Sequence, residues 1–250
     1  MKNQNKKTKN NIAVIGCGIM GSMIIKLLKK LNYKVLGLDK GDDINQAKFC
    51  NIVILAVKPQ DFKNISNLEL NKDTLVVSIM AGISVANIKK QLKVNKIVRA
   101  MPNTPVQIGK GFVGYFTTPQ VSTTDKEFIN QLFNKMGINM QVSKEDDINK
   151  ITAISGSGPA YIFHTILSFI NGAKDLGIKE KDAKNMVLQT IIGSLAMIDE
   201  DTNIEELMKN VTSKGGTTEA GLKVFNTKNT NQIWKNAINS AYKRAKELSK

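Results

Sequence analysis

The sequence predicts an α/β protein with two parts: a Rossmann-type parallel sheet, shortened by one βα unit, and an all-helical domain. Three observations lead to this prediction. A glycine turn that begins at Gly16 follows the first apolar run. Short apolar strands then alternate with helical stretches up to about residue 147, as in a parallel sheet covered on both faces. Beyond that point the strand signals stop and helical periodicity continues to the end.

The glycine turn reads Gly16-Cys17-Gly18-Ile19-Met20-Gly21. An apolar run beginning at Ile12 precedes it and a helical pattern follows, which is the setting in which G-x-G-x-x-G binds a dinucleotide. Gly16 permits the tight turn, Gly18 lets backbone N–H groups approach a pyrophosphate, and Gly21 lets the helix pack closely on the strand. The alternative, glycines that only serve a β–α turn, is less favoured in this context.

The first part has seven predicted strands and three prominent predicted helices. The strands are Ile12–Gly16, Lys34–Asp39, Ile52–Val57, Thr74–Ser78, Lys96–Met101, Phe112–Tyr115 and Ile138–Val142, and the helices are Met20–Leu31, Val85–Leu92 and Asp125–Met136. Only residues 40–51 separate the second strand from the third. That length does not accommodate both a helix and a strand, so we expect one βα unit to be missing and the adenosine side of the cleft to be more open.

The second part contains four predicted helices, Pro159–Leu176, Glu180–Asp199, Ile204–Val211 and Thr230–Leu248. The first two are apolar over most of their circumference, so they must be buried. A helix-to-helix homodimer buries them more readily than the first domain alone. We therefore divide the chain into a disordered basic tail (1–10), a dinucleotide-binding domain (11–147) and an all-helical substrate and dimerisation domain (148–250).

Composition narrows the function classes. The formal net charge is +15, but only two of the 36 basic residues are arginines, and scattered lysines without interleaved aromatics do not indicate nucleic-acid binding. No apolar run approaches the ~20 residues of a membrane span. Two cysteines without a C-x-x-C pair indicate a reducing, cytoplasmic location.

His164 is the sole histidine, so we expect no metal site. Its apolar sequence context predicts that it packs in the core.

A second glycine loop, Thr212–Leu222, interrupts the helices. Gly215 and Gly216 allow unusual backbone angles, and hydroxyls at Ser213, Thr217 and Thr218 are nearby. One interpretation is an anion site whose converging N–H donors suit a carboxylate. The other is a capped helix start, with Thr217 or Thr218 as the N-cap. The residues alone leave both open.

Over nearly its whole length beyond the tail, the chain resembles the pyrroline-5-carboxylate reductases. The resemblance rests on Gly16–Gly21, Ala56-Val-Lys-Pro59, Ser78-Ile-Met-Ala-Gly82, Arg99-Ala-Met-Pro-Asn-Thr-Pro105, Ser155-Gly-Ser-Gly-Pro-Ala-Tyr161 and Thr212-Ser-Lys-Gly-Gly-Thr-Thr218, in this order. It implies a dinucleotide-binding domain followed by a helical domain that interlocks with its twin. It also implies reduction of 1-pyrroline-5-carboxylate to L-proline, the last step of proline biosynthesis, with NADPH or NADH. Relatives form homodimers and rings of dimers.

The resemblance also implies roles for individual residues. Cofactor contacts fall on Ile15, Gly16, Cys17, Gly18, Ile19, Met20, Gly21, Val57, Lys58, Ala81, Asn103 and Asn210. Substrate contacts fall on Glu145, Ser213, Gly215, Gly216, Thr217 and Thr218. Thr152 matches the hydroxyl residue proposed as the proton donor.

Several of these positions have an ordinary structural interpretation as well. The alternative for Lys58 is a surface lysine, and for Asn103 it is a residue that caps the turn between two prolines. Glu145 is at least as well explained as part of a solvated acidic helix start, and Thr152 is equally well explained as an ordinary β-branched helix residue. For Lys58 the position before Pro59, at a strand's carboxyl end, favours function. For Asn103 the functional interpretation is also favoured.

Two residues depart from the family pattern. Asp39 ends the second strand 18 residues after Gly21, where an acid binds the ribose hydroxyls of NAD and repels the phosphate of NADP. Asp39 therefore favours NADH, with Lys40 as a partial offset, whereas the family favours NADPH. Lys214 replaces the usual proline of the second glycine loop. Two alternative functions stay open: a reductase of another cyclic imine, and a catalytically decayed nucleotide-binding scaffold.

Overall fold

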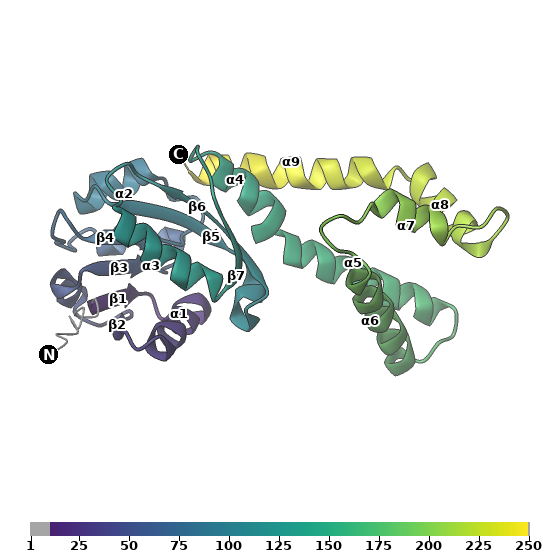
Figure 1. The fold of residues 1–250 in the computed structure, drawn as a ribbon, viewed down its shortest axis with the longest axis horizontal. Helices are drawn as coiled ribbons and strands as arrows, with labels where there is room; N and C mark the ends of the chain where they lie inside the picture. The colour runs from purple at the N-terminus through teal and green to yellow at the C-terminus, as the bar shows by residue number, and fades with distance from the viewer. Residues whose placement is uncertain (1–10, 250) are drawn as a thin grey trace, which may run out of the picture. The chain divides into compact units, whose positions relative to one another are not determined.

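The computed structural model describes residues 11–249 (Figure 1); the predicted tail, 1–10, lies outside them. The chain forms two compact units. The first contains the described residues up to Ser157 together with 240–249, and the second is Gly158–Asn239.

The first unit is built on a seven-stranded sheet in the order β2-β1-β3-β4-β5-β6-β7. Its strands are β1 (Asn11–Ile15), β2 (Lys34–Leu38), β3 (Ile52–Leu55), β4 (Leu75–Ser78), β5 (Ile97–Pro102), β6 (Gly111–Thr117) and β7 (Gly137–Gln141). All seven predicted strands are present, each within two residues of its expected ends. β2 is an edge strand, so the third strand of a full Rossmann half is missing, as the short 40–51 segment predicts.

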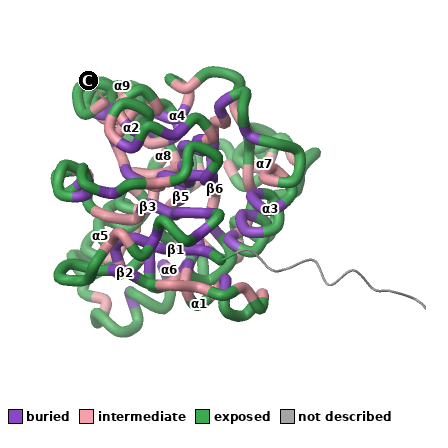
Figure 2. Tube along the Cα trace, turned by 90° about the vertical axis from the view of Figure 1, so that its left-hand side faces the viewer, coloured by how far each residue is buried: buried purple, intermediate pink, exposed green. Residues whose placement is uncertain are grey.

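Helices cover both faces of this sheet because its strands alternate their buried side chains. Ile12 and Val14 of β1 face a core with α1 (Ile19–Lys30) and α3 (Thr123–Asn134), while Ala13 and Ile15 face the opposite core. That second core is formed with α2 (Val85–Leu92) and two 3₁₀ helices, η1 (Ile44–Phe49) and η2 (Pro59–Ile65). The buried strands run through the middle of Figure 2.

Two strands, β6 and β7, depart from the parallel order that the sequence predicts. β6 pairs antiparallel with β5, whereas every other neighbouring pair is parallel. The connection, residues 103–110 with the 3₁₀ helix η3 (Thr104–Ile108), is too short for the crossover that a parallel strand requires. The chain therefore turns back beside β5. β7 follows α3 and pairs parallel with β6, so it also runs opposite to β1–β5.

The end of the first unit extends further along the chain than the predicted boundary after residue 147. α4 (Asp147–Ile151) and the π-helical turn η4 (Thr152–Gly156) contact β5, and α4 also contacts β6. The end of α9 belongs to this unit as well: the Tyr242 hydroxyl donates to Asp146 Oδ2 at 2.6 Å. Burial of Ile148, Ile151 and Ala153 explains why this segment stays with the sheet.

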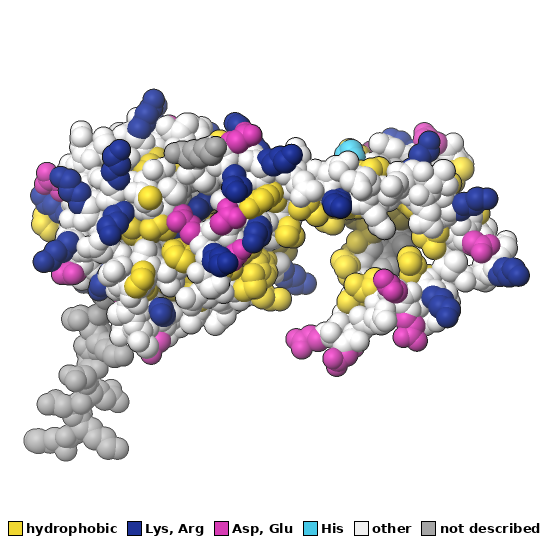
Figure 3. Space-filling model, turned by 90° about the horizontal axis from the view of Figure 1, so that it is seen from above, with side chains coloured by type: hydrophobic (Ala, Val, Ile, Leu, Met, Phe, Trp, Pro, Cys, Tyr) yellow, Lys and Arg dark blue, Asp and Glu magenta, His cyan; other side chains and the backbone are white. Residues whose placement is uncertain are grey.

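The second unit contains α5 (Gly158–Asp175), α6 (Glu180–Ala196), α7 (Ile204–Asn210), α8 (Thr217–Thr227) and the first part of α9 (Thr230–Leu248). Its interior is small: among its hydrophobic side chains only Ala183 and Val187 are buried. Large apolar side chains are exposed instead, among them Phe163, Leu167, Met186, Ile192, Leu195 and Phe225, and hydrophobic surface is visible in Figure 3. His164, predicted to lie in a core, is exposed in the single chain.

A pH-dependent test follows from the hydrogen bond that Tyr242 donates to Asp146. This bond is the main reason why the pKa of Asp146 is lowered. A lowered pKa in the folded state stabilises the protein above the ordinary carboxyl pKa, and the stabilisation is lost as the pH falls through the lowered value. We expect Tyr242→Phe to lower Tm slightly at pH 7, and the difference from wild type to shrink below about pH 4. A Tm difference that stays constant from pH 7 to pH 3 would contradict this.

Candidate functional site

The carboxyl ends of β1, β2 and β3 meet at the glycine turn. Two backbone hydrogen bonds extend the strand ladders into this turn: Gly16 N–H donates to the Leu38 carbonyl and Ala56 N–H donates to the Ile15 carbonyl, both at 2.8 Å. The turn is therefore fixed from both sides. In open α/β sheets this edge is where ligands bind.

The first and third glycines of the motif are required by close backbone contacts. Gly16 has φ of 93°, and a Cβ there would lie 2.7 Å from the Ala56 carbonyl carbon and from Val57 N. A Cβ on Gly21 would overlap the Gly16 carbonyl oxygen. These contacts bring the start of α1 against the end of β1, as the motif predicts.

The middle glycine leaves the helix N-terminus open. Gly18 is the N-cap of α1 and provides no side-chain cap, and a Cβ there would meet no atom within 4 Å. The N–H groups of Ile19, Met20 and Gly21 form the first turn, where no preceding carbonyl is available. Open N–H donors at the positive end of a helix fit a pyrophosphate.

A cleft of about 470 Å³ lies beside this turn. It brings together six of the predicted cofactor residues, Ile15, Gly16, Gly18, Asp39, Val57 and Lys58. It does not include Cys17, Ile19, Met20, Gly21, Ala81 or Asn103. Sequence reasoning missed Gly41, Asp42, Ile44, Asp61 and Asn64, which line it together with Lys40. Their position directly after β2 or β3 was the available signal.

Carboxylates give the β2 side of the cleft a negative character. Asp39 is exposed, and its backbone N–H donates to Asp42 Oδ2 at 2.8 Å. Burial, followed by the charges of Asp39 and Asp42, raises the pKa of the Cys17 thiol. Cys17 is thus a protonated thiol at neutral pH, which does not suit it for nucleophilic chemistry.

Asn103 and Thr152 already use their side chains within the first unit. The Asn103 carboxamide accepts from Phe112 N–H at 2.9 Å and donates to Ser155 Oγ at 3.1 Å. The Thr152 hydroxyl donates to the Ile148 carbonyl at 2.7 Å. Asn103 does not cap η3 with its side chain; it ties the end of β5 to β6 and η4. The hydroxyl oxygen of Thr152 keeps acceptor capacity toward a further donor.

Glu145, predicted on the substrate side, is held by the buried Arg99 instead. Its Oε1 accepts from Arg99 Nη1 and from the backbone N–H of Val85, both at 2.8 Å. These two donors give the Glu145 carboxylate a structural role that does not require a ligand. The sequence analysis names Arg99 only as part of a family motif and did not predict this ion pair.

The second glycine loop forms the start of α8 in the second unit. Gly216 is the N-cap and has no side-chain cap, so Thr217 and Thr218 are the first two helical residues and not caps. Gly215 has φ of 75°, and its N–H donates to Glu219 Oε2 at 2.7 Å. The exposed hydroxyls and N–H groups of Thr217 and Thr218 fit a carboxylate. Asn210, at the end of α7, is also exposed.

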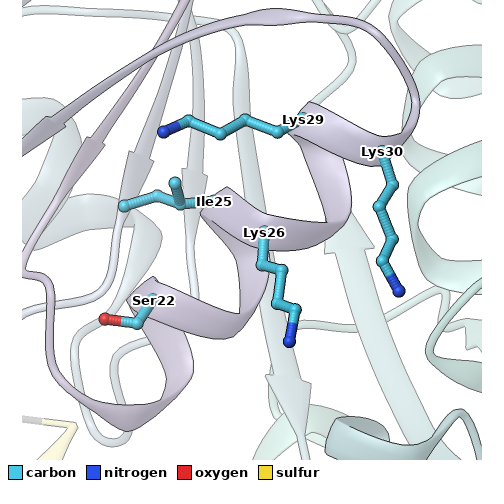
Figure 4. A pocket seen from close by; sticks show the side chains of 5 residues that line it. All are labelled: Ser22, Ile25, Lys26, Lys29 and Lys30. Atoms are coloured by element: carbon cyan, nitrogen blue, oxygen red, sulfur yellow. The ribbon is translucent and has the colours of Figure 1, made fainter.

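Other features of the described residues do not form a second site of this kind. The groove along α1 contains Lys26, Lys29 and Lys30, but Figure 4 shows Lys29 extending to one side while Lys26 and Lys30 extend downward, so the three amines do not converge. Within 11–249 no group of three or more His, Cys, Asp or Glu side chains could hold a metal ion. In the same range, no helix has the length and apolar character that crossing a membrane requires.

The two contrasting glycines give a direct test of the cleft. We expect Gly18→Ala to keep Tm close to wild type but to weaken NADH binding about tenfold or more, because its Cβ occupies open space where the pyrophosphate would lie. Gly21→Ala is the matched control, and we expect it to lower Tm through its overlap with the Gly16 carbonyl. Isothermal titration and thermal unfolding measure both effects. Unchanged NADH affinity in Gly18→Ala would contradict the assignment.

Comparisons with known proteins agree with this geometry. The model of the pyrroline-5-carboxylate reductase dimerisation domain matches residues 145–248. A pyrroline-5-carboxylate reductase of Staphylococcus haemolyticus is 36% identical over 214 residues, which cover 84% of this chain and 79% of that protein.

Solved structures give the same result. The crystal structure of Plasmodium falciparum pyrroline carboxylate reductase with NADP bound has a TM-score of 0.87 and 30% identity, covering 96% of this chain and 98% of that one. A pyrroline-5-carboxylate reductase from Coxiella burnetii has a TM-score of 0.84 and 32% identity, covering 97% and 99%. With the glycine turn, the shortened sheet and the helical unit, these matches establish that the chain belongs to the pyrroline-5-carboxylate reductase family.

Proposed function

We propose that this protein reduces 1-pyrroline-5-carboxylate to L-proline with NAD(P)H. Its relatives are named pyrroline-5-carboxylate reductases. The observation that carries the proposal is the open N-terminus of α1 beside the 470 Å³ cleft, in a chain whose relative from Plasmodium falciparum holds NADP. When bound, the dinucleotide supplies the hydride for the imine carbon, and the ring nitrogen carries the proton of the iminium form.

The protein's contribution is orientation. We assign the pyrophosphate to the N–H groups of Gly18, Ile19 and Met20, and the ribose to Val57 and Lys58 at the end of β3. We assign the substrate carboxylate to Thr217 and Thr218 at the start of α8, with Ser213, Gly215 and Gly216 shaping the turn. Binding the cofactor pyrophosphate and the substrate carboxylate restricts where the imine carbon lies relative to the hydride, and such orientation lowers the barrier of the reaction.

Asn103, Ala81 and Thr152 are the residues proposed around the nicotinamide. Asn103 fixes the end of β5, and Ala81 lies on the loop that follows β4. Thr152 is a poor free acid, and its hydrogen is directed at the Ile148 carbonyl. We propose that its oxygen accepts a hydrogen bond from the protonated ring nitrogen or from a water molecule beside it. Glu145 acts as a structural partner of Arg99 in this scheme.

We further propose a preference for NADH. Asp39 and Asp42 lie on the side of the cleft beside β2, where a carboxylate accepts hydrogen bonds from ribose hydroxyls and repels a 2′-phosphate. Lys40, also lining the cleft, offsets part of this charge. The NADP-bound relative favours the opposite preference, so kinetics with both cofactors must decide.

Residues 145–248 match the dimerisation domain of the family, and a homodimer through the helical unit explains the exposed apolar surface of that unit. Assembly into rings of dimers is a finer proposal that rests on the resemblance alone. Two free cysteines, Cys17 and Cys50, are compatible with the cytoplasmic location that we propose.

An NAD(P)H-oxidation assay with 1-pyrroline-5-carboxylate tests the function directly. We expect turnover with proline as the product, and a higher kcat/KM with NADH than with NADPH. Asp39→Ser should shift this ratio toward NADPH. Binding of cofactor without any turnover would favour a nucleotide-binding scaffold, and a preference for NADPH above about tenfold would overturn the role of Asp39.

A prediction for Thr152 concerns one hydrogen bond. We expect Thr152→Ala to lower kcat about fivefold, the effect of losing about 1 kcal/mol in the transition state, with the KM for NADH unchanged. Thr152→Ser retains the hydroxyl and should restore most of kcat. Weakened cofactor binding in the alanine variant would show that the role assigned to Thr152 is wrong.

A prediction for assembly uses two exposed isoleucines. Ile192 on α6 is 60% exposed and Ile138 on β7, outside residues 145–248, is 72% exposed. We expect Ile192→Glu to give monomers in light scattering, because burying a charge in an apolar interface is costly. Ile138→Glu, the matched control, should remain dimeric. Loss of the dimer in the control alone would place the interface elsewhere.

A further inference from the structure

Arg99 forms a buried polar hub in the first unit. It lies in β5 and is only 2% exposed. Its Nη1 donates to Glu145 Oε1 at 2.8 Å, and its Nη2 donates to Asn149 Oδ1 at 2.9 Å and to Ser249 Oγ at 3.3 Å. A guanidinium buried away from water requires hydrogen-bond acceptors of this kind. The arrangement therefore fixes three segments that are far apart in the sequence.

One of these segments is the end of α9. The Ser249 hydroxyl lies within hydrogen-bond distance of Asn149 Oδ1, at 3.0 Å, and of the Ala245 carbonyl, at 2.9 Å, and it also accepts from Arg99. These contacts dock the C-terminal turn of α9 against β5 and α4.

The docked turn packs directly against the loop between β4 and α2, residues 79–84. A Cβ built on Gly82 would lie 2.6 Å from Leu248 Cβ and 2.9 Å from the Leu248 carbonyl oxygen. Gly82 is buried and has φ of 74°. The backbone of this loop and that of Leu248 thus touch with no room for a side chain on Gly82.

The far end of the same loop is held by the same hub. Glu145 Oε1, which accepts from Arg99, also accepts from the backbone N–H of Val85, the first residue of α2, at 2.8 Å. Leu248 holds the middle of the loop and Glu145 holds its end. Ala81, a proposed nicotinamide-ribose contact, lies beside Gly82.

We propose that Leu248 and Ser249 form a C-terminal latch that positions the Ala81 loop for the cofactor. They are positioning residues, which act through Gly82 and Arg99 without touching the reacting atoms. The inference rests on the proposed function, because the resemblance gives Ala81 its role. The latch also gives α9 a second role. The first part of this helix belongs to the helical unit and its end belongs to the sheet unit, where the end positions a cofactor loop.

The test compares variants at the latch in the full chain carrying an N-terminal tag. We expect Leu248→Gly, which removes the Cβ that contacts Gly82, and Ser249→Ala each to raise the KM and Kd for NADH about fivefold, with kcat and the KM for pyrroline-5-carboxylate within about twofold of wild type. Ser249→Thr should restore the wild-type values. Arg244→Ala is the matched control on the same helix, since it removes only an exposed ion pair with Glu247.

The readouts separate positioning from simple stability. Unchanged KM and Kd for NADH in both Leu248→Gly and Ser249→Ala would overturn the latch. A lower Tm with proportional loss of active enzyme and unchanged constants would also overturn it, because the residues would then be only structural. Wild-type enzyme that binds NADH without turnover would overturn the proposed function, and the Kd comparison would still decide the latch.

Discussion

The structure depends on the fixed position of the glycine turn between β2 and β3. Gly16 and Ala56 continue the strand ladders into the turn, and Gly21 allows α1 to start against the Gly16 carbonyl. With both sides held, the N–H groups at the start of α1 need no rearrangement to receive a phosphate. The cleft beside them follows from this constraint, since the ends of β2 and β3 supply its walls.

Several predicted site residues that do not line this cleft contribute by holding backbone. Asn103 connects β5 to β6 and η4, Thr152 bonds within its own helix, and Glu145 joins Arg99 to α2. A hydride transfer asks for orientation more than for acid–base side chains. A scaffold whose polar groups are paired with one another meets that demand.

Periodicity predicted the strands, the edge position of β2 and the main helices, because these depend on local pattern and on the length of the 40–51 segment. It did not predict the antiparallel β6, which depends on how short the 103–110 connection is in space. Nor did it predict Glu145 as a partner of Arg99, or the return of 240–249 to the first unit, since these contacts join residues 46 to 150 positions apart. His164 is exposed because the helical unit of a single chain buries few apolar side chains.

A crystal structure of the assembled enzyme with NADH and proline is the sharpest test of this arrangement. We expect phosphate oxygens on the N–H groups of Gly18 to Met20 and the proline carboxylate on Thr217 and Thr218 of one subunit or its partner, with the proline ring facing the nicotinamide. A carboxylate held elsewhere, with the turn before α8 directed away from the cofactor in every subunit pairing, would contradict it.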